Sequence, residues 1–95
     1  MSAYLISTID IQDPAGYEEY RKLVGPPLAK YGGKFLVRGG EMEYLEGDWR
    51  PKRVVVVEFE SMDRARAFHR SPEYAEAMKI RQRTSVSSVI IVQGT

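Results

Sequence analysis

The first third of the chain changes from strand-like alternation to helical spacing of its apolar residues. Residues 3–11, AYLISTIDI, alternate and consist largely of β-forming types, which predicts a strand. Asp13 and Pro14 then predict a helix start, because a capping side chain precedes a proline at the first helical position. Apolar side chains recur at helical spacing beyond it: Tyr17, Tyr20, Val24, Leu28 and Tyr31.

Glycine and proline clusters divide the next part of the chain. Residues 25–27, Gly-Pro-Pro, interrupt the helical pattern, and we expect a kink or two short helices, since proline removes a backbone donor. Gly32 and Gly33 predict the helix end. A strand is predicted for residues 34–38, with a bend at the next two glycines and a continuation through residues 44–45.

The second half of the chain again passes from strand to helix to strand. Residues 53–59, RVVVVEF, are the strongest predicted strand. Ser61 caps a predicted helix that begins SMDRARAF, and Ser71 followed by proline starts another. Residues 86–94 predict a last strand. The order is β-α-β-β-α-β, so we expect an α+β, ferredoxin-like fold in which a four-stranded antiparallel sheet carries helices on one face.

Two predicted strands are apolar on both faces. Residues 54–57 are four consecutive valines, and residues 89–92 read VIIV. Side chains alternate between the faces of a sheet, so only half of each run can face the helices. The chain is too short to cover the second face itself, and we expect a homodimer through the open sheet face, which forms a dimeric α/β barrel. The alternative is a monomer with a few exposed valines.

Composition excludes several classes of protein. The chain has 95 residues, no cysteine, one histidine and a net charge of +1. We therefore expect a single domain over residues 1–95, no disulfide, no metal site and no nucleic-acid partner. No signal peptide, membrane segment, phosphate loop or dinucleotide fingerprint is recognisable, which favours a cytoplasmic protein with no membrane partner and no cofactor.

A charged strand end followed by two glycines is the first candidate for a site. Arg38 is expected on the same face as Lys34 and Leu36, since all three are spaced by two. It could be a solvated arginine or a partner of a nearby carboxylate, for which the candidates are Glu41, Glu43 and Glu58. The functional alternative is an anion clamp at a pocket mouth, where Gly39 and Gly40 let a ligand approach the backbone.

The last predicted helix and the residues before it supply further candidates. Tyr74, Met78 and Arg81 share a helix face, and Arg81 either covers apolar surface with its stem or binds an anion together with Arg38 in one cavity. His69 lies about 100° from the core stripe, as a packing residue or as a general base oriented by Glu58, Glu73 or Tyr74. Trp49, in a turn, is a lid or dimer-contact candidate.

Three segments resemble one family. They are YGGKFLVRGG at residues 31–40, LEGDWRPKRVVVVEFES at 45–61 and SPEYAEAMKIRQRTS at 71–85. Together they are similar to the domain-of-unknown-function 1330 family of the dimeric α/β-barrel superfamily, in which Arg81 matches a recurrent arginine. The resemblance implies the fold and the homodimer. An aromatic pair such as Trp-Tyr precedes SPEY in that family, where this chain has Phe68 and His69.

Three functions remain open at this point. The first is a homodimer that binds a small acidic or aromatic molecule between sheet and helices. The second is a cofactor-free enzyme on a similar compound, of the isomerase or monooxygenase type found among the superfamily relatives. The third is a structural or interaction domain with no ligand. The residues predicted to bind the ligand are Arg38, Gly39, Gly40, His69, Tyr74 and Arg81, with His69 as the catalytic candidate.

Overall fold

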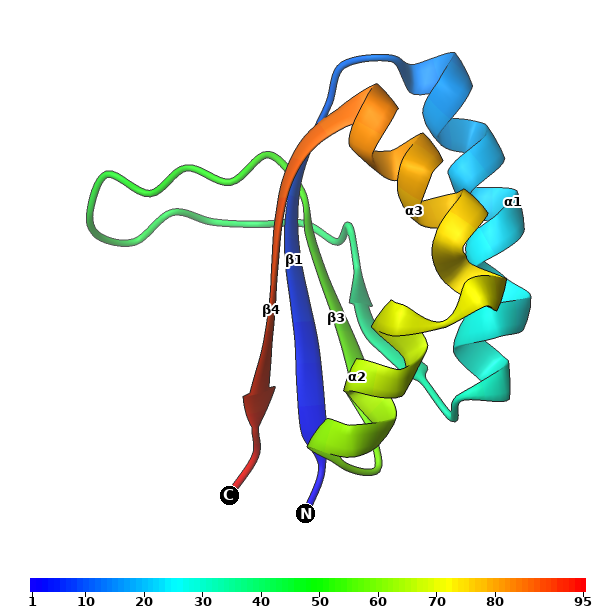
Figure 1. Cartoon of the computed structure of the whole chain (residues 1–95). Coiled ribbons are helices and arrows are strands. Elements are labelled where there is room, and N and C mark those ends of the chain that lie inside the picture. The colour runs from blue at the N-terminus through cyan, green and yellow to red at the C-terminus, as the bar shows by residue number, and fades with distance from the viewer.

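The structure, a computed structural model of residues 1–95, is a twisted sheet with helices along one side (Figure 1). The strands are β1 (Ala3–Ile11), β2 (Lys34–Arg38), β3 (Val54–Phe59) and β4 (Ser85–Gln93), and the helices are α1 (Pro14–Lys30), α2 (Met62–Arg70) and α3 (Pro72–Thr84). The sheet order is β2-β3-β1-β4 and every pairing is antiparallel. This confirms the ferredoxin-like βαββαβ arrangement.

Each helix begins at the capping residue that the sequence predicts. The Asp13 carboxylate accepts a hydrogen bond from the Gly16 amide at 3.1 Å. The hydroxyl of Ser61 caps α2 and that of Ser71 caps α3, each accepting an amide bond at 3.2 Å. A cap of this kind stabilises a helix by about 1 kcal/mol, because it satisfies a donor that has no partner within the helix.

Helix α1 runs unbroken through Pro26 and Pro27, so the expected kink or division is wrong. The two prolines deprive the carbonyls of Lys22 and Leu23 of their usual partners, four residues back. Both of those residues are exposed, and water can solvate their carbonyls. The prolines therefore cost two hydrogen bonds on the solvent side without ending the helix.

The end of α1 is set by its two glycines, as predicted. Gly32 has φ 77°, and its amide donates to the Ala29 carbonyl at 3.0 Å. The Gly33 amide donates to the Leu28 carbonyl at 2.8 Å. These are the two bonds of a Schellman motif, which favours glycine in the left-handed conformation just beyond a helix. The motif turns the chain sharply into β2.

The core lies between the sheet and the helices. Alternate residues of the central strands point toward the helices and are buried, among them Leu5, Ile9, Val57 and Phe59. They pack against the apolar faces of the helices, which contribute Tyr17, Val24, Leu28, Ala65, Phe68, Tyr74 and Ala77. The molecule is only 17 Å thick along its shortest axis, so the sheet has a single cover.

The opposite sheet face is apolar and has no cover within the chain. Its apolar side chains, called here the open face, are Tyr4, Ile6, Val37, Val54, Val56, Val86, Ile90 and Val92. Ile90 is 58% exposed and Val86 is 69% exposed. The chain exposes 6204 Å² in all, against about 5,500 Å² for a compact monomer of its mass. The exposed area is therefore larger than that of a compact monomer of this mass.

The segment between β2 and β3, residues 39–53, has no helix or strand and is called here the arm. The predicted continuation of the strand through residues 44–45 is therefore wrong. In Figure 1 the arm extends from the sheet on the side away from the helices. The Tyr44 hydroxyl donates to the Pro51 carbonyl at 2.6 Å, and the Arg50 guanidinium lies 5.0 Å from the Tyr44 ring centre. These contacts join the two halves of the arm while Trp49 stays exposed.

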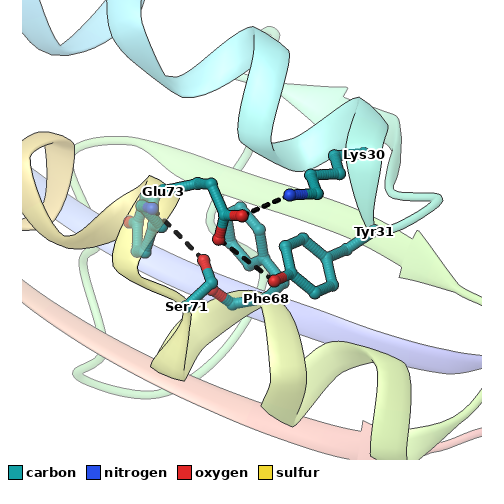
Figure 2. Close-up of polar contacts among 6 residues, drawn as sticks. Lys30, Tyr31, Phe68, Ser71 and Glu73 are labelled. Atoms are coloured by element: carbon teal, nitrogen blue, oxygen red, sulfur yellow. Dashed lines mark hydrogen bonds and ion pairs between the residues drawn. The ribbon is translucent and has the colours of Figure 1, made fainter.

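A polar contact joins the end of α1 to the start of α3 (Figure 2). The Glu73 carboxylate accepts from Lys30 Nζ and, at 3.1 Å, from the Tyr31 hydroxyl. Glu73 lies in the first turn of α3, where the helix dipole also favours a negative charge. The hydrogen bond from Lys30 is the main reason that the pKa of Glu73 lies below its usual value.

We predict that Glu73→Gln lowers the melting temperature at neutral pH more than the control Glu76→Gln, whose residue pairs only with Lys79 one turn away. Because the folded-state pKa of Glu73 is lowered, its stabilisation is present above the ordinary value of 4.5 and is lost as the pH falls through the folded-state value. Calorimetric scans across this range should therefore show the wild-type and Glu73→Gln curves converging in acid. A difference that persists at low pH would contradict this origin.

Candidate functional site

A β-bulge in β2 decides which way Arg38 points. Phe35 pairs with Val57 and Arg38 pairs with Val55, with an irregularity between Phe35 and Val37. Both partners are buried under the helices, so Phe35 and Arg38 share that face. The expected grouping of Arg38 with Lys34 is wrong, because the extra residue of the bulge reverses the alternation. The Arg38 guanidinium lies 4.2 Å from the Phe35 ring centre.

The sheet and the helices enclose a cavity, called here the sheet–helix cavity, with a volume of about 30 Å³. Twelve of its 17 lining residues are hydrophobic: Leu5, Ile9, Tyr17, Tyr20, Val24, Leu28, Phe35, Val55, Val57, Phe68, Tyr74 and Val89. The other five are Ser7, Arg21, Arg38, Arg53 and His69. No carboxylate lines it, and Arg38 forms no ion pair with Glu41, Glu43 or Glu58, which was one of the alternatives for this residue. The lining is therefore apolar with a positive charge.

Arg53 is a cavity residue that the sequence analysis did not single out. It comes two residues before Val55, and the period of a strand places both on the helix side. This spacing from Val55 is the feature of the sequence that could have placed Arg53 in the cavity. The Arg53 carbonyl accepts from the Ile9 amide at 2.9 Å, which holds its backbone in the sheet. Its Nε is buried and has no hydrogen-bond partner.

Gly39 makes room for the Arg53 side chain. Gly39 has φ 68°, a conformation that residues with a side chain rarely adopt. A Cβ placed on Gly39 would lie 1.9 Å from Arg53 Nη1. At Gly40 a Cβ would meet nothing within 4 Å. Neither glycine lines the cavity, and the observed role of Gly39 is to leave space for a guanidinium. Their predicted role in the approach of a ligand stays a prediction.

Two tyrosines and Arg81 form a polar chain beside the cavity. The hydroxyls of Tyr20 and Tyr74 lie 3.0 Å apart, and Arg81 Nε donates to the Tyr74 hydroxyl at 3.3 Å. Arg81 is 4% exposed, and its Nη1 also donates to Ser87. Arg38 lines the cavity and Arg81 does not, so an anion site shared by the two stays a prediction. Arg81 acts on the cavity through Tyr74.

The hydrogen bonds among Arg81, Tyr74 and Tyr20 indicate which hydroxyl donates to which. Because Tyr74 accepts from Arg81, the arrangement favours Tyr74 donating to Tyr20. Burial, and then the neighbouring Tyr74, raise the pKa of Tyr20 well above its ordinary value of 10. Tyr20 therefore keeps its proton at neutral pH and can donate it within the cavity that both tyrosines line.

His69 is half-buried in the cavity wall on the side of β4, as its place on the helix predicts. It makes no hydrogen bond to an orienting partner. Glu73 is bound to Lys30 and Tyr31, Glu58 lies on the open side of the sheet, and the Tyr74 ring centre is 6.1 Å from that of His69. Burial, followed by the charges of Arg81 and Arg70, lowers its pKa below 6.5. The imidazole is neutral at pH 7.

We predict that the imidazole proton signals of His69, the single histidine, titrate with a midpoint below 6.5 in a nuclear magnetic resonance experiment. Arg70→Gln should raise the midpoint, whereas Arg66→Gln should change it less, since Arg66 is paired with Asp63 at 2.9 Å. Because the folded-state pKa of His69 is lowered, the stability that goes with a neutral imidazole is present above pH 6.5. It is lost as the pH falls through the folded-state pKa. A midpoint above 6.5 would contradict the lowered pKa of His69 and its assigned causes.

Comparison with known families gives one match over almost the whole chain. The family model described as "Domain of unknown function (DUF1330)" matches residues 2–95. No curated protein matches the chain. No group of three His, Asp or Glu side chains is arranged to hold a metal ion, and none of the helices has the length and apolar character needed to cross a membrane.

Solved structures show the same fold at low sequence identity. A protein of unknown function from Rhodopseudomonas palustris has a TM-score of 0.79 at 23% identity, covering 99% of this chain and 82% of its own. A dimeric ferredoxin-like protein of unknown function from Jannaschia sp. CCS1 has a TM-score of 0.78 at 10% identity, covering 99% and 100%. SnoaB, a cofactor-independent oxygenase from Streptomyces nogalater, has a TM-score of 0.70 at 15% identity, covering 99% and 93%.

Proposed function

The chain belongs to the DUF1330 family, and we propose that it acts as a homodimer that binds a small acidic or aromatic molecule in the sheet–helix cavity. The observation that carries the proposal is the lining of that cavity. Aromatic and aliphatic side chains surround a small number of polar groups, which is the usual composition of a small-molecule site. The polar groups include three arginines and no carboxylate, so the site favours an anion.

Exposed arginines locate the mouth of the cavity. Arg21 of α1 and Arg38 of β2 both line the cavity and are both exposed, so the opening lies between this helix and the edge strand. A cavity of 30 Å³ is smaller than the roughly 150 Å³ that holds a benzene ring elsewhere. An aromatic ligand therefore enters only by moving the mouth side chains, of which Arg38 is the freest because it has no ion pair.

Binding can be tested with simple aromatic acids and a variant that fills the cavity. We predict that such acids shift the His69 imidazole signals and the amide signals of β3, and that Ser7→Val abolishes these shifts. Ser7 is buried in the cavity wall, and valine is larger and suits a strand. The matched control Ser88→Val lies on the other sheet face and should bind as the wild type does. Wild-type spectra that no aromatic acid changes would contradict the proposal.

The homodimer is supported by the open face. A contiguous apolar surface over four strands is unusual in a monomer, and two copies packed face to face would cover it. The structural neighbours from Jannaschia sp. CCS1 and Bacteroides fragilis are described as dimeric. The arm extends on the same side of the sheet and carries further exposed apolar residues, namely Met42, Tyr44, Leu45 and Trp49. We include the arm in the proposed interface, which should bury about 800 Å² per partner.

We predict that Ile90→Asp converts the protein to a folded monomer. Ile90 is 58% exposed in the single chain, so the charge stays solvated in a monomer but would be buried and unpaired in the dimer. The control Leu23→Asp, on α1 away from the open face and 45% exposed, should leave the dimer intact. Sedimentation velocity at micromolar concentration measures the oligomeric state of the wild type and of both variants. A wild-type monomer under these conditions, or an Ile90→Asp dimer, would contradict the proposed interface.

A cofactor-free enzyme is the second candidate, and His69 favours it. The imidazole lies in the cavity wall, has its pKa lowered and forms no hydrogen bond, so it is available to accept a proton from a bound molecule. The fold is shared with the cofactor-independent oxygenase SnoaB. Conversion of a bound aromatic acid without added flavin, metal or nicotinamide, lost in His69→Gln, would distinguish the enzyme from the binding protein.

A further inference from the structure

Arg53 is a half-buried cation whose buried Nε is unsatisfied. Its Nε has no hydrogen bond, and the guanidinium forms no ion pair with any carboxylate of the chain. A buried donor left unsatisfied destabilises a protein, and a structural arginine is normally held by carboxylates or carbonyls. Gly39 nevertheless adopts a left-handed conformation that leaves space for this guanidinium. The site thus maintains an unpaired charge, which indicates that the partner is a ligand.

The sheet brings Arg38 and Arg53 together on one face. Arg38 lies opposite Val55 on the neighbouring strand, and Arg53 comes two residues before Val55. Diagonal neighbours of this kind have Cα atoms about 7–8 Å apart, within reach of long side chains. Two guanidiniums at this spacing can bind the same carboxylate, and the planar fork of arginine suits that group. The charge of Arg53 also acts on the buried Tyr17 phenol, which lies beside it.

The size of the cavity agrees with a carboxylate. A volume of 30 Å³ holds about two water molecules, which is the space of two carboxylate oxygens. The ring of Phe35 also lines the cavity, and the Arg38 guanidinium lies 4.2 Å from its centre. If Arg38 turns from Phe35 to a carboxylate, it exposes one face of that ring. An aromatic ring attached to the carboxylate then takes the place of the guanidinium.

We propose that Arg53, assisted by Arg38, forms the carboxylate subsite of the sheet–helix cavity, and that the ligand is a planar aromatic monocarboxylate whose ring stacks on Phe35. This inference rests on the proposed function and specifies its ligand class. Arg53 is the residue that recognises the charge, because it is the deeper of the two and is already in position. Arg38 completes the subsite when the ligand arrives.

The experiment is a calorimetric titration with three probes: benzoate, its neutral analogue benzamide, and acetate. Wild-type protein should bind benzoate at least tenfold more tightly than either of the others, since each lacks one of the two recognition elements. Arg53→Gln should weaken benzoate binding by about tenfold to a hundredfold, the range expected for a lost charge-assisted hydrogen bond, and should leave benzamide unchanged. Arg83→Gln, which removes an exposed charge near the end of α3, is the control and should alter neither affinity.

A second pair of variants moves the Arg53 guanidinium without removing it. Gly39→Ala places a methyl group against Arg53 Nη1 and should weaken benzoate binding, whereas Gly40→Ala meets no atom and should not. Stability gives an independent readout. Because Arg53 forms no ion pair in the chain and its buried Nε is unsatisfied, Arg53→Gln should melt at the same temperature as the wild type or higher, whereas loss of a structural arginine would lower it.

The outcomes separate the inference from the proposed function. If benzamide and benzoate bind equally and Arg53→Gln changes neither, the carboxylate subsite is overturned while small-molecule binding stands. If acetate binds as tightly as benzoate, the aromatic part of the ligand class is overturned. If none of these probes binds, and other aromatic acids also fail to change the spectra, the proposed function itself fails. A lowered melting temperature in Arg53→Gln with unchanged benzoate affinity would make Arg53 structural.

Discussion

A β-sheet has two faces, and this chain has helices for only one of them. Every valine in the run at residues 54–57 must point to one side or the other, so half of the run is left without a cover from its own chain. The same holds for residues 89–92 on β4. This constraint explains the thin molecule, the surface in excess of a compact monomer and the apolar arm on the open side. It also leaves the helix side free to hold a cavity with its own chemistry.

That cavity concentrates positive charge where a core would ordinarily exclude it. The buried Arg81 is stabilised because Tyr74 and Ser87 accept its hydrogen bonds. Tyr74 in turn lines the cavity, so Arg81 is linked to the cavity wall by this hydrogen bond. The buried Nε of Arg53 has no such partner, and burial, followed by the charges of Arg81 and Arg70, lowers the pKa of His69. Together these groups produce a positive potential in an apolar, weakly screened space, where electrostatic interactions are stronger than in water.

The sequence predicts the elements, the caps and the uncovered face, because these depend on local chemistry and on a simple period. It predicts the site less well. Simple alternation places Arg38 on the wrong face because a bulge, which needs only one extra residue, reverses the alternation from that point. Helix α1 continues through two prolines because its unpaired carbonyls lie on the solvent side. The spacing of two from Val55 places Arg53 on the helix side, but nothing in a strand sequence reveals that its Nε will be buried and lack a partner.

The position of Trp49 affects how folding of this protein is observed. It is the single tryptophan, it is 69% exposed, and it lies in the arm, away from the core of sheet and helices. Its fluorescence therefore reports the surroundings of the arm, while circular dichroism reports the helices and strands. If dilution or denaturant separates two copies before each unfolds, the two signals will change at different concentrations. Coincidence of the two curves is a test of two-state unfolding, so this one indole makes assembly and folding separately visible.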